Sequence, residues 1–134
     1  MYKFYNPNPM CKRVGDCVIR AVSKALDMGW EETYLDLSIQ GYMMGDLLSS
    51  NAVWGNYLKN KGYCREVISN ECPDCYTISD FCKEHPHGTF IVGTGTHAVA
   101  VISGNIYDAW DSSMEQPIYY YVKKEVNEDV RTDE

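Results

Sequence analysis

The spacing of the apolar residues changes halfway along this chain, and that change limits the possible folds more than any other feature. Up to Gly62 the apolar residues recur at helical intervals, as Val18, Val22 and Leu26 do. Beyond Gly62 they fall in short runs rich in Val, Ile and Tyr, which turn-forming residues separate. Helices followed by neighbouring strands predict an α+β domain, in which N-terminal helices pack on a C-terminal antiparallel β-sheet.

Capping and turn residues indicate where the individual elements begin and end. Asp16 is a suitable N-cap for the first helix, which begins at Asp16 or Cys17. Thr77 opens a short helix through a capping box that Asp80 completes. Glycines are expected to end or interrupt the earlier helices, at Gly29, Gly41, Gly45 and Gly62. Strands are expected at residues 63–68, 89–92, 97–102, 105–110 and 117–123.

The length and composition bound the domain organisation. The chain has 134 residues, of which 45% are hydrophobic and 23% charged, as in ordinary globular proteins. We expect one domain over residues 1–125, followed by an acidic flexible tail over residues 126–134.

Charge and cysteine content predict the setting in which the protein works. The net charge of −7 repels phosphate backbones and anionic lipid, so neither nucleic acid nor a membrane is an expected partner. The N-terminus carries no hydrophobic leader, and apolar runs such as residues 98–102 are far too short to span a bilayer. These features predict a cytoplasmic protein whose six cysteines are thiols, ligands or catalysts rather than disulfides.

Cys17 stands where a loop becomes a helix, directly after Gly15 and Asp16. Unpaired N–H groups and the helix dipole stabilise a thiolate at such a position and can also hold an oxyanion. Gly15 allows a sharp turn and leaves room for a substrate carbonyl. Cys17 is therefore a candidate nucleophile, although most free cysteines are simply small buried hydrophobes.

Residues 97–111 predict a β-hairpin that carries a histidine and two aspartates. If residues 103–104 form a two-residue turn, His97 and Asp108 lie on one face as diagonal neighbours, about 7 Å apart at Cα. A turn longer by one residue would place Asp111 opposite His97 instead. Asp108 is therefore the first candidate and Asp111 the second for a carboxylate that orients the imidazole. The alternative is a structural histidine beside two solvated aspartates.

A cysteine at an early helix start, then more helices, then histidine and aspartate on adjacent strands resembles the papain-like cysteine peptidases. The resemblance is closest to their compact bacterial and phage branch, which includes double-glycine leader peptidases and small bacteriophage-encoded proteins. Shared motifs are Asn-Pro-Asn-Pro, Gly-Asp-Cys, Cys-Pro-Asp-Cys-Tyr, Gly-Thr-His and Tyr-Asp-Ala-Trp-Asp.

This resemblance implies a cysteine hydrolase without a cofactor that acts on a peptide or protein, at an amide or isopeptide bond. Cys17 would be the nucleophile, His97 the general base, and Asp108 or Asp111 the residue that orients His97. A phage-encoded protein of this kind would work in the cytosol of its bacterial host.

The chain departs from the papain-like pattern at the oxyanion hole, where Cys11 replaces the usual glutamine. Asn8 or Asn6, held by the neighbouring prolines, or else Arg13, are candidates for the missing donor. Losing one such donor typically costs ~10²–10³ in rate. A second hypothesis is therefore a catalytically silent interaction module, with which a phage engages a host protein.

Cys72 and Cys75 have the two-residue spacing of a zinc knuckle. No second pair with this spacing accompanies them in the sequence. A zinc-stabilised adaptor is accordingly the weakest hypothesis, and a tight turn with two ordinary thiols is favoured.

Overall fold

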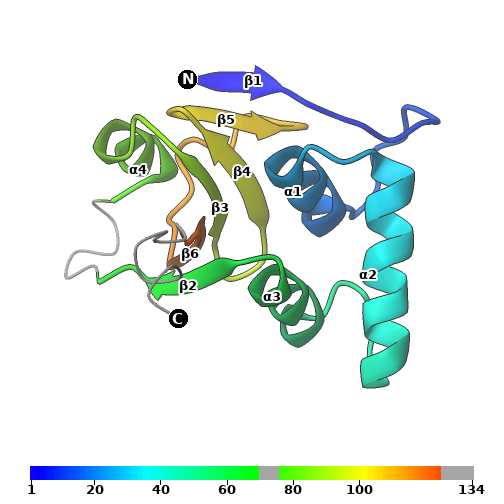
Figure 1. Cartoon of the computed structure of the whole chain (residues 1–134). Coiled ribbons are helices and arrows are strands. Elements are labelled where there is room, and N and C mark those ends of the chain that lie inside the picture. The colour runs from blue at the N-terminus through cyan, green and yellow to red at the C-terminus, as the bar shows by residue number, and fades with distance from the viewer. Residues whose placement is uncertain (70–75, 125–134) are drawn as a thin grey trace, which may run out of the picture.

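The computed structural model describes residues 1–69 and 76–124. In this described part a six-stranded sheet lies between the helices (Figure 1). The strands follow one another in the order β1-β5-β4-β3-β6-β2. The described helices are α1 (Cys17–Leu26), α2 (Trp30–Met44), α3 (Asn51–Asn60) and α4 (Ile78–Glu84). The strands are β1 (Tyr2–Phe4), β2 (Tyr63–Val67), β3 (Thr89–Gly93), β4 (Ala98–Ile102), β5 (Asn105–Asp108) and β6 (Tyr119–Lys123).

The α+β class is confirmed, but the expectation of a purely antiparallel C-terminal sheet is wrong. Strand β1 comes from the N-terminus and pairs with β5 in parallel, with Tyr2 opposite Ile106. The N–H of Ile106 donates to the carbonyl of Met1 at 2.9 Å, and the N–H of Tyr5 donates to that of Asp108 at 2.8 Å. A strand of three residues has too few side chains for a readable alternation, so only pairing with β5 defines it.

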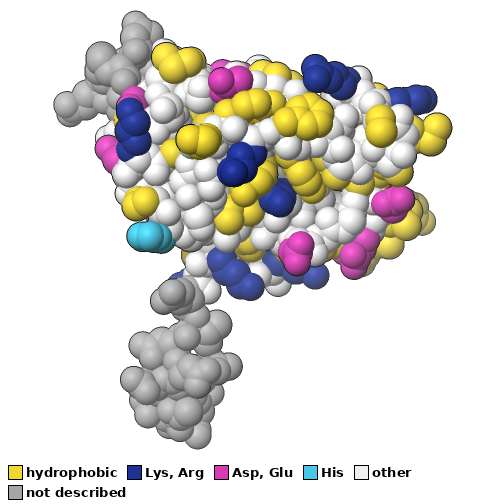
Figure 2. All heavy atoms as spheres, turned by 90° about the horizontal axis from the view of Figure 1, so that it is seen from above, with side chains coloured by type: hydrophobic (Ala, Val, Ile, Leu, Met, Phe, Trp, Pro, Cys, Tyr) yellow, Lys and Arg dark blue, Asp and Glu magenta, His cyan; other side chains and the backbone are white. Residues whose placement is uncertain are grey.

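The edge formed by β1 is short, and its surroundings mix apolar and charged side chains. Figure 2 looks onto the molecule from this side and shows apolar side chains with lysine and arginine side chains among them. Phe4 is 61% exposed, and the neighbouring Lys3 is also exposed. Short length and a lysine are the usual means by which an edge strand avoids pairing with other chains.

Two apolar clusters lie on opposite faces of the sheet. Helices α1, α2 and α3 gather on one side, and α4 covers the other (Figure 1). On the three-helix side the side chains with no exposed surface include Val22, Leu37, Leu58 and Ile91. On the α4 side they include Ile78, Phe81, Val92 and Val101. Because α1 packs between the sheet and α2, its polar residues Arg20 and Ser23 are buried with the apolar ones.

The expected interruption of the second helix at Gly41 is wrong. Helix α2 runs through Gly41 and ends at Met44, and the C-cap Gly45 has the left-handed φ of 70°. A Cβ on Gly41 would lie 2.7 Å from the backbone oxygen of Asp46. The absence of a side chain at Gly41 therefore lets the backbone near Asp46 lie close to the helix, and this glycine does not break the helix.

Several local predictions from capping and turn chemistry are confirmed. Thr77 and Asp80 form the expected capping box at the start of α4. Ser103 and Gly104, with φ of 51° and 75°, form the two-residue turn between β4 and β5, and Ile102 pairs with Asn105.

The expected tail over residues 126–134 lies outside the described residues. None of the described helices is long and apolar enough to cross a membrane.

Candidate active site

Cys17 is the first residue of α1 and meets the imidazole of His97, which directly precedes β4. The Cys17 side chain is half-buried and hydrogen-bonds the His97 side chain and the backbone N–H of Ala98. Helix α1 packs directly on β4 in the described structure, and this contact brings the two side chains together. The thiol and imidazole, far apart in the chain, thus lie in hydrogen-bonding contact.

Asp108, at the end of β5, holds the other side of the imidazole. Nε2 of His97 lies 2.7 Å from Oδ2 of Asp108, which leaves Nδ1 for the sulfur. The ring of Trp110 stacks on the His97 ring with centroids 4.4 Å apart and planes 27° apart. The imidazole is therefore fixed by a hydrogen bond in its plane and by an aromatic ring against its face.

Asp111, the second candidate for this role, lies elsewhere. Its carboxylate is exposed and accepts a hydrogen bond of 3.0 Å from the backbone N–H of Ser113. The two-residue turn at 103–104 explains the difference, because that register puts Asp108 beside His97.

The surroundings favour a charged pair of thiolate and imidazolium. Burial raises the pKa of Cys17, but the hydrogen bonds from His97 and Ala98 and nearby positive charge outweigh it, so the pKa falls below the ordinary 9.0. Burial lowers the pKa of His97, but hydrogen bonds and charges of Asp108 and Cys17 outweigh it and raise the pKa from 6.5 to about 9. Cys17 therefore loses its proton easily while His97 keeps one.

Asp108 is held in its charged form. Burial raises the pKa of this carboxyl, but hydrogen bonds from His97, Ser112 and the backbone of Ala109 outweigh burial and lower the pKa below 3.8. Ser112 Oγ donates to Oδ2 and the Ala109 N–H donates to Oδ1, each at 2.7 Å.

Sequence reasoning missed Arg20, which connects this carboxylate to the start of α1. Its Nη2 donates to Oδ1 of Asp108 at 3.0 Å, and its Nη1 donates to Oδ1 of Asp16 at 2.5 Å. Trp30 Nε1 donates to the other oxygen of Asp16 at 2.9 Å. The available signal was a basic residue one helical turn after an aspartate, within an otherwise apolar helical stretch.

Asp16 occupies the expected N-cap position, but the expected capping by its side chain is wrong. Its Oδ1 accepts a hydrogen bond from Arg20 and its Oδ2 accepts one from Trp30, and the Asp16 side chain makes no capping hydrogen bond to the first turn of α1. The first-turn N–H groups beside Cys17 are therefore left for another acceptor.

Of the three expected oxyanion donors, Asn8 is the one buried near the start of α1. Its Oδ1 accepts a hydrogen bond of 2.8 Å from Met10 N, and it lines a cavity of about 430 Å³ together with Gly15. Asn6 instead holds the loop, since its Nδ2 donates to the carbonyl of Lys12 at 3.2 Å. The exposed Arg13 lies over the ring of Phe4, with 5.9 Å between the guanidinium carbon and the ring centroid.

The described residues include no group of three or more His, Cys, Asp or Glu side chains that could hold a metal ion. The candidate ligands Cys72 and Cys75 lie outside the described residues.

Comparison with protein-family models, with curated proteins and with solved structures yields no match.

Proposed function

We propose that this protein is a papain-like cysteine hydrolase that cleaves an amide or isopeptide bond in a peptide or protein. The observation that carries the proposal is the hydrogen-bonded series Cys17–His97–Asp108, in which the thiol has a lowered pKa. A nucleophile, a base in contact with it and a group that orients the base are the parts of a catalytic triad.

The reaction begins with a thiolate on Cys17 and a proton on His97. The sulfur attacks the carbonyl carbon of the substrate, and His97 gives its proton to the amine that leaves. The acyl group is then a thioester on Cys17. A water molecule attacks this thioester while His97 takes its proton, which releases the carboxylic acid and restores the thiolate. An amine in place of water would give acyl transfer by the same groups.

The oxyanion formed in both steps needs hydrogen-bond donors beside the sulfur. The uncapped first turn of α1 offers backbone N–H groups at that position. The buried side-chain amide of Asn8 is the sequence candidate best suited to add a second donor, since Asn8 lines one cavity together with Gly15 and Asp16. This arrangement would substitute for the glutamine that Cys11 replaces.

The test is selective alkylation followed by acylation. Iodoacetamide near pH 6 should label Cys17 faster than the exposed Cys11, and p-nitrophenyl acetate should leave an acetyl group on Cys17 that mass spectrometry detects. The variant His97→Ala should lose both effects, whereas the control Cys82→Ala should keep them. Uniform labelling of the thiols would contradict the proposal. Selective labelling without acylation would favour the silent interaction module.

A further inference from the structure

Strand β2 ends the sheet on the side opposite β1, and no described strand pairs with its outer edge. In the described part of the chain β2 pairs with β6 alone. Lys124 N donates to the carbonyl of Gly62 at 2.7 Å, and Ile68 N donates to the carbonyl of Ile118 at 3.0 Å. Because backbone groups alternate in an antiparallel pair, residues 62, 64, 66 and 68 face β6. The N–H and C=O groups of residues 63, 65 and 67 therefore point outward.

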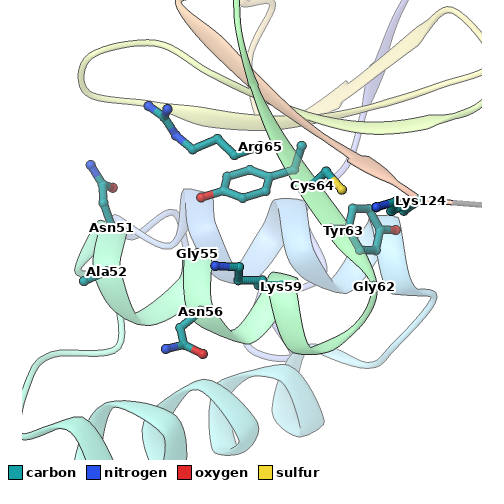
Figure 3. A pocket seen from close by; sticks show the side chains of 11 residues that line it. Asn51, Ala52, Gly55, Asn56, Lys59, Gly62, Tyr63, Cys64, Arg65 and Lys124 are labelled. Carbon is teal, nitrogen blue, oxygen red and sulfur yellow. The ribbon is translucent and has the colours of Figure 1, made fainter.

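A groove of about 890 Å³ runs between this strand and α3 (Figure 3). Lys59 reaches toward it from α3 and Arg65 from β2, and Lys124 lines its far end. None of the described lining residues is acidic, although the whole chain has a net charge of −7. The groove is thus a local site of positive charge beside an open strand edge.

Arg65 is exposed, but two tyrosine side chains hold it in position. Its guanidinium carbon lies 4.4 Å from the ring centroid of Tyr119, and its side chain hydrogen-bonds that of Tyr121. Both tyrosines are buried and Tyr121 lines the groove, so the Arg65 side chain rests on a fixed aromatic surface. Glu66 is the acidic residue of β2, and alternation along the strand directs it to the opposite face.

We propose that an extended, acidic segment of a partner protein binds here by adding a strand to the open edge of β2. The outward backbone groups would pair with its main chain, and every second side chain would face the groove. Carboxylates at those positions would meet Lys59, Arg65 and Lys124. This inference does not depend on catalysis by Cys17.

Charge selects this partner over two others. A nucleic acid carries phosphates along its whole length and would meet the net negative field of the rest of the protein. A second copy pairing through β2 would bring two Arg65 side chains to one face, where like charges repel. A peptide with a few carboxylates needs only the local positive charge.

The first test compares labelled peptides with alternating Glu and Val, Gln and Val, or Lys and Val by fluorescence anisotropy. The Glu peptide should bind best, and more weakly as salt rises. Lys59→Gln and Arg65→Gln should each weaken it about two- to five-fold. The matched control Lys83→Gln in α4, on the other face of the sheet, and Cys17→Ala should leave affinity unchanged. Equal binding of the three peptides would overturn the proposal.

The second test asks whether the main chain pairs as a strand. The Glu peptide is N-methylated at every second residue, in two complementary versions. One version blocks the hydrogen bonds to β2 and should lose binding at least ten-fold, while the other should keep it. Equal affinity of the two versions would overturn strand addition. Two further results would assign the edge to another partner and overturn the proposal. One is tighter binding of an oligothymidylate than of the Glu peptide, and the other is dimerisation that the Glu peptide does not disrupt.

Discussion

Arg20 and Asp108, 88 positions apart in the chain, are joined by a hydrogen bond of 3.0 Å between Nη2 and Oδ1. Their side chains are 4% and 1% exposed. Burying a charge is unfavourable unless it is paired, and here one guanidinium serves the two carboxylates of Asp16 and Asp108. The pair ties α1, which carries Cys17, to β5, which carries the carboxylate that holds His97.

Replacing Arg20 by Met should destabilise the fold by about 3–5 kcal/mol, because two buried carboxylates lose their partner. Urea unfolding at pH 7 measures this change. The control Arg13→Met removes an exposed arginine and should change the unfolding free energy by less than about 0.5 kcal/mol. Equal effects of the two substitutions would show that the buried pair is not what stabilises this region.

The two aspartates of the hairpin should differ in their effect on Cys17. Asp108→Asn removes a charge that keeps His97 protonated, so the pKa of Cys17 should rise and its alkylation at pH 6 should slow about ten-fold. Asp111→Asn, which changes an exposed carboxylate, should leave the rate unchanged. The measurement is the iodoacetamide rate at Cys17 by mass spectrometry. A slower rate in Asp111→Asn would mean that Asp111 also holds His97 in its charged form, which would contradict the assignment of that role to Asp108.

The His97–Asp108 pair should make stability depend on pH. Although burial lowers the pKa of His97, its partners raise it from 6.5 to about 9, so the folded state binds this proton more tightly than the unfolded state. The resulting stabilisation is full below about pH 6.5 and is lost as pH rises toward 9. Asp108 has the opposite sign: its lowered pKa stabilises the fold above about pH 4, and this contribution is lost in acid.

Unfolding of Cys17→Ala with and without His97→Gln isolates this effect, because the thiol no longer titrates. Asp108 still raises the pKa of His97 in that background, so the stability difference between the two proteins should shrink from pH 6 to pH 9. A difference that stays constant over this range would mean that the fold does not shift the pKa of His97 from its unfolded value.

Gly41→Ala should destabilise the protein by about 1–3 kcal/mol, since the added methyl group lies 2.7 Å from the backbone oxygen of Asp46. Within a helix the same change is normally stabilising, by about 0.5–1 kcal/mol. Gly15→Ala is the control, because its Cβ would have no described atom within 4 Å. Thermal unfolding compares the two. If Gly41→Ala stabilised the protein instead, the loop at Asp46 would have to move and make room for the methyl group.

Local chemistry was enough to predict most elements and half of the candidate site. The capping box at Thr77 and the turn at residues 103–104 depend on neighbouring residues alone, so they follow from the sequence. The turn sets the register of the hairpin, and the register puts His97 beside Asp108. Cys17 at a helix start was predictable for the same reason.

Tertiary contacts decided the rest. Strand β1 exists because β5 supplies its hydrogen bonds, and Gly41 remains helical because a neighbouring loop packs against it. Asp16 binds Arg20 and Trp30 instead of capping its helix, since burial of a guanidinium requires paired carboxylates. The sequence by itself determined which side chains stand at the helix start and on the hairpin. Only packing of α1 on β4 decided that the thiol meets the imidazole, because contacts between distant segments depend on how apolar faces fit together.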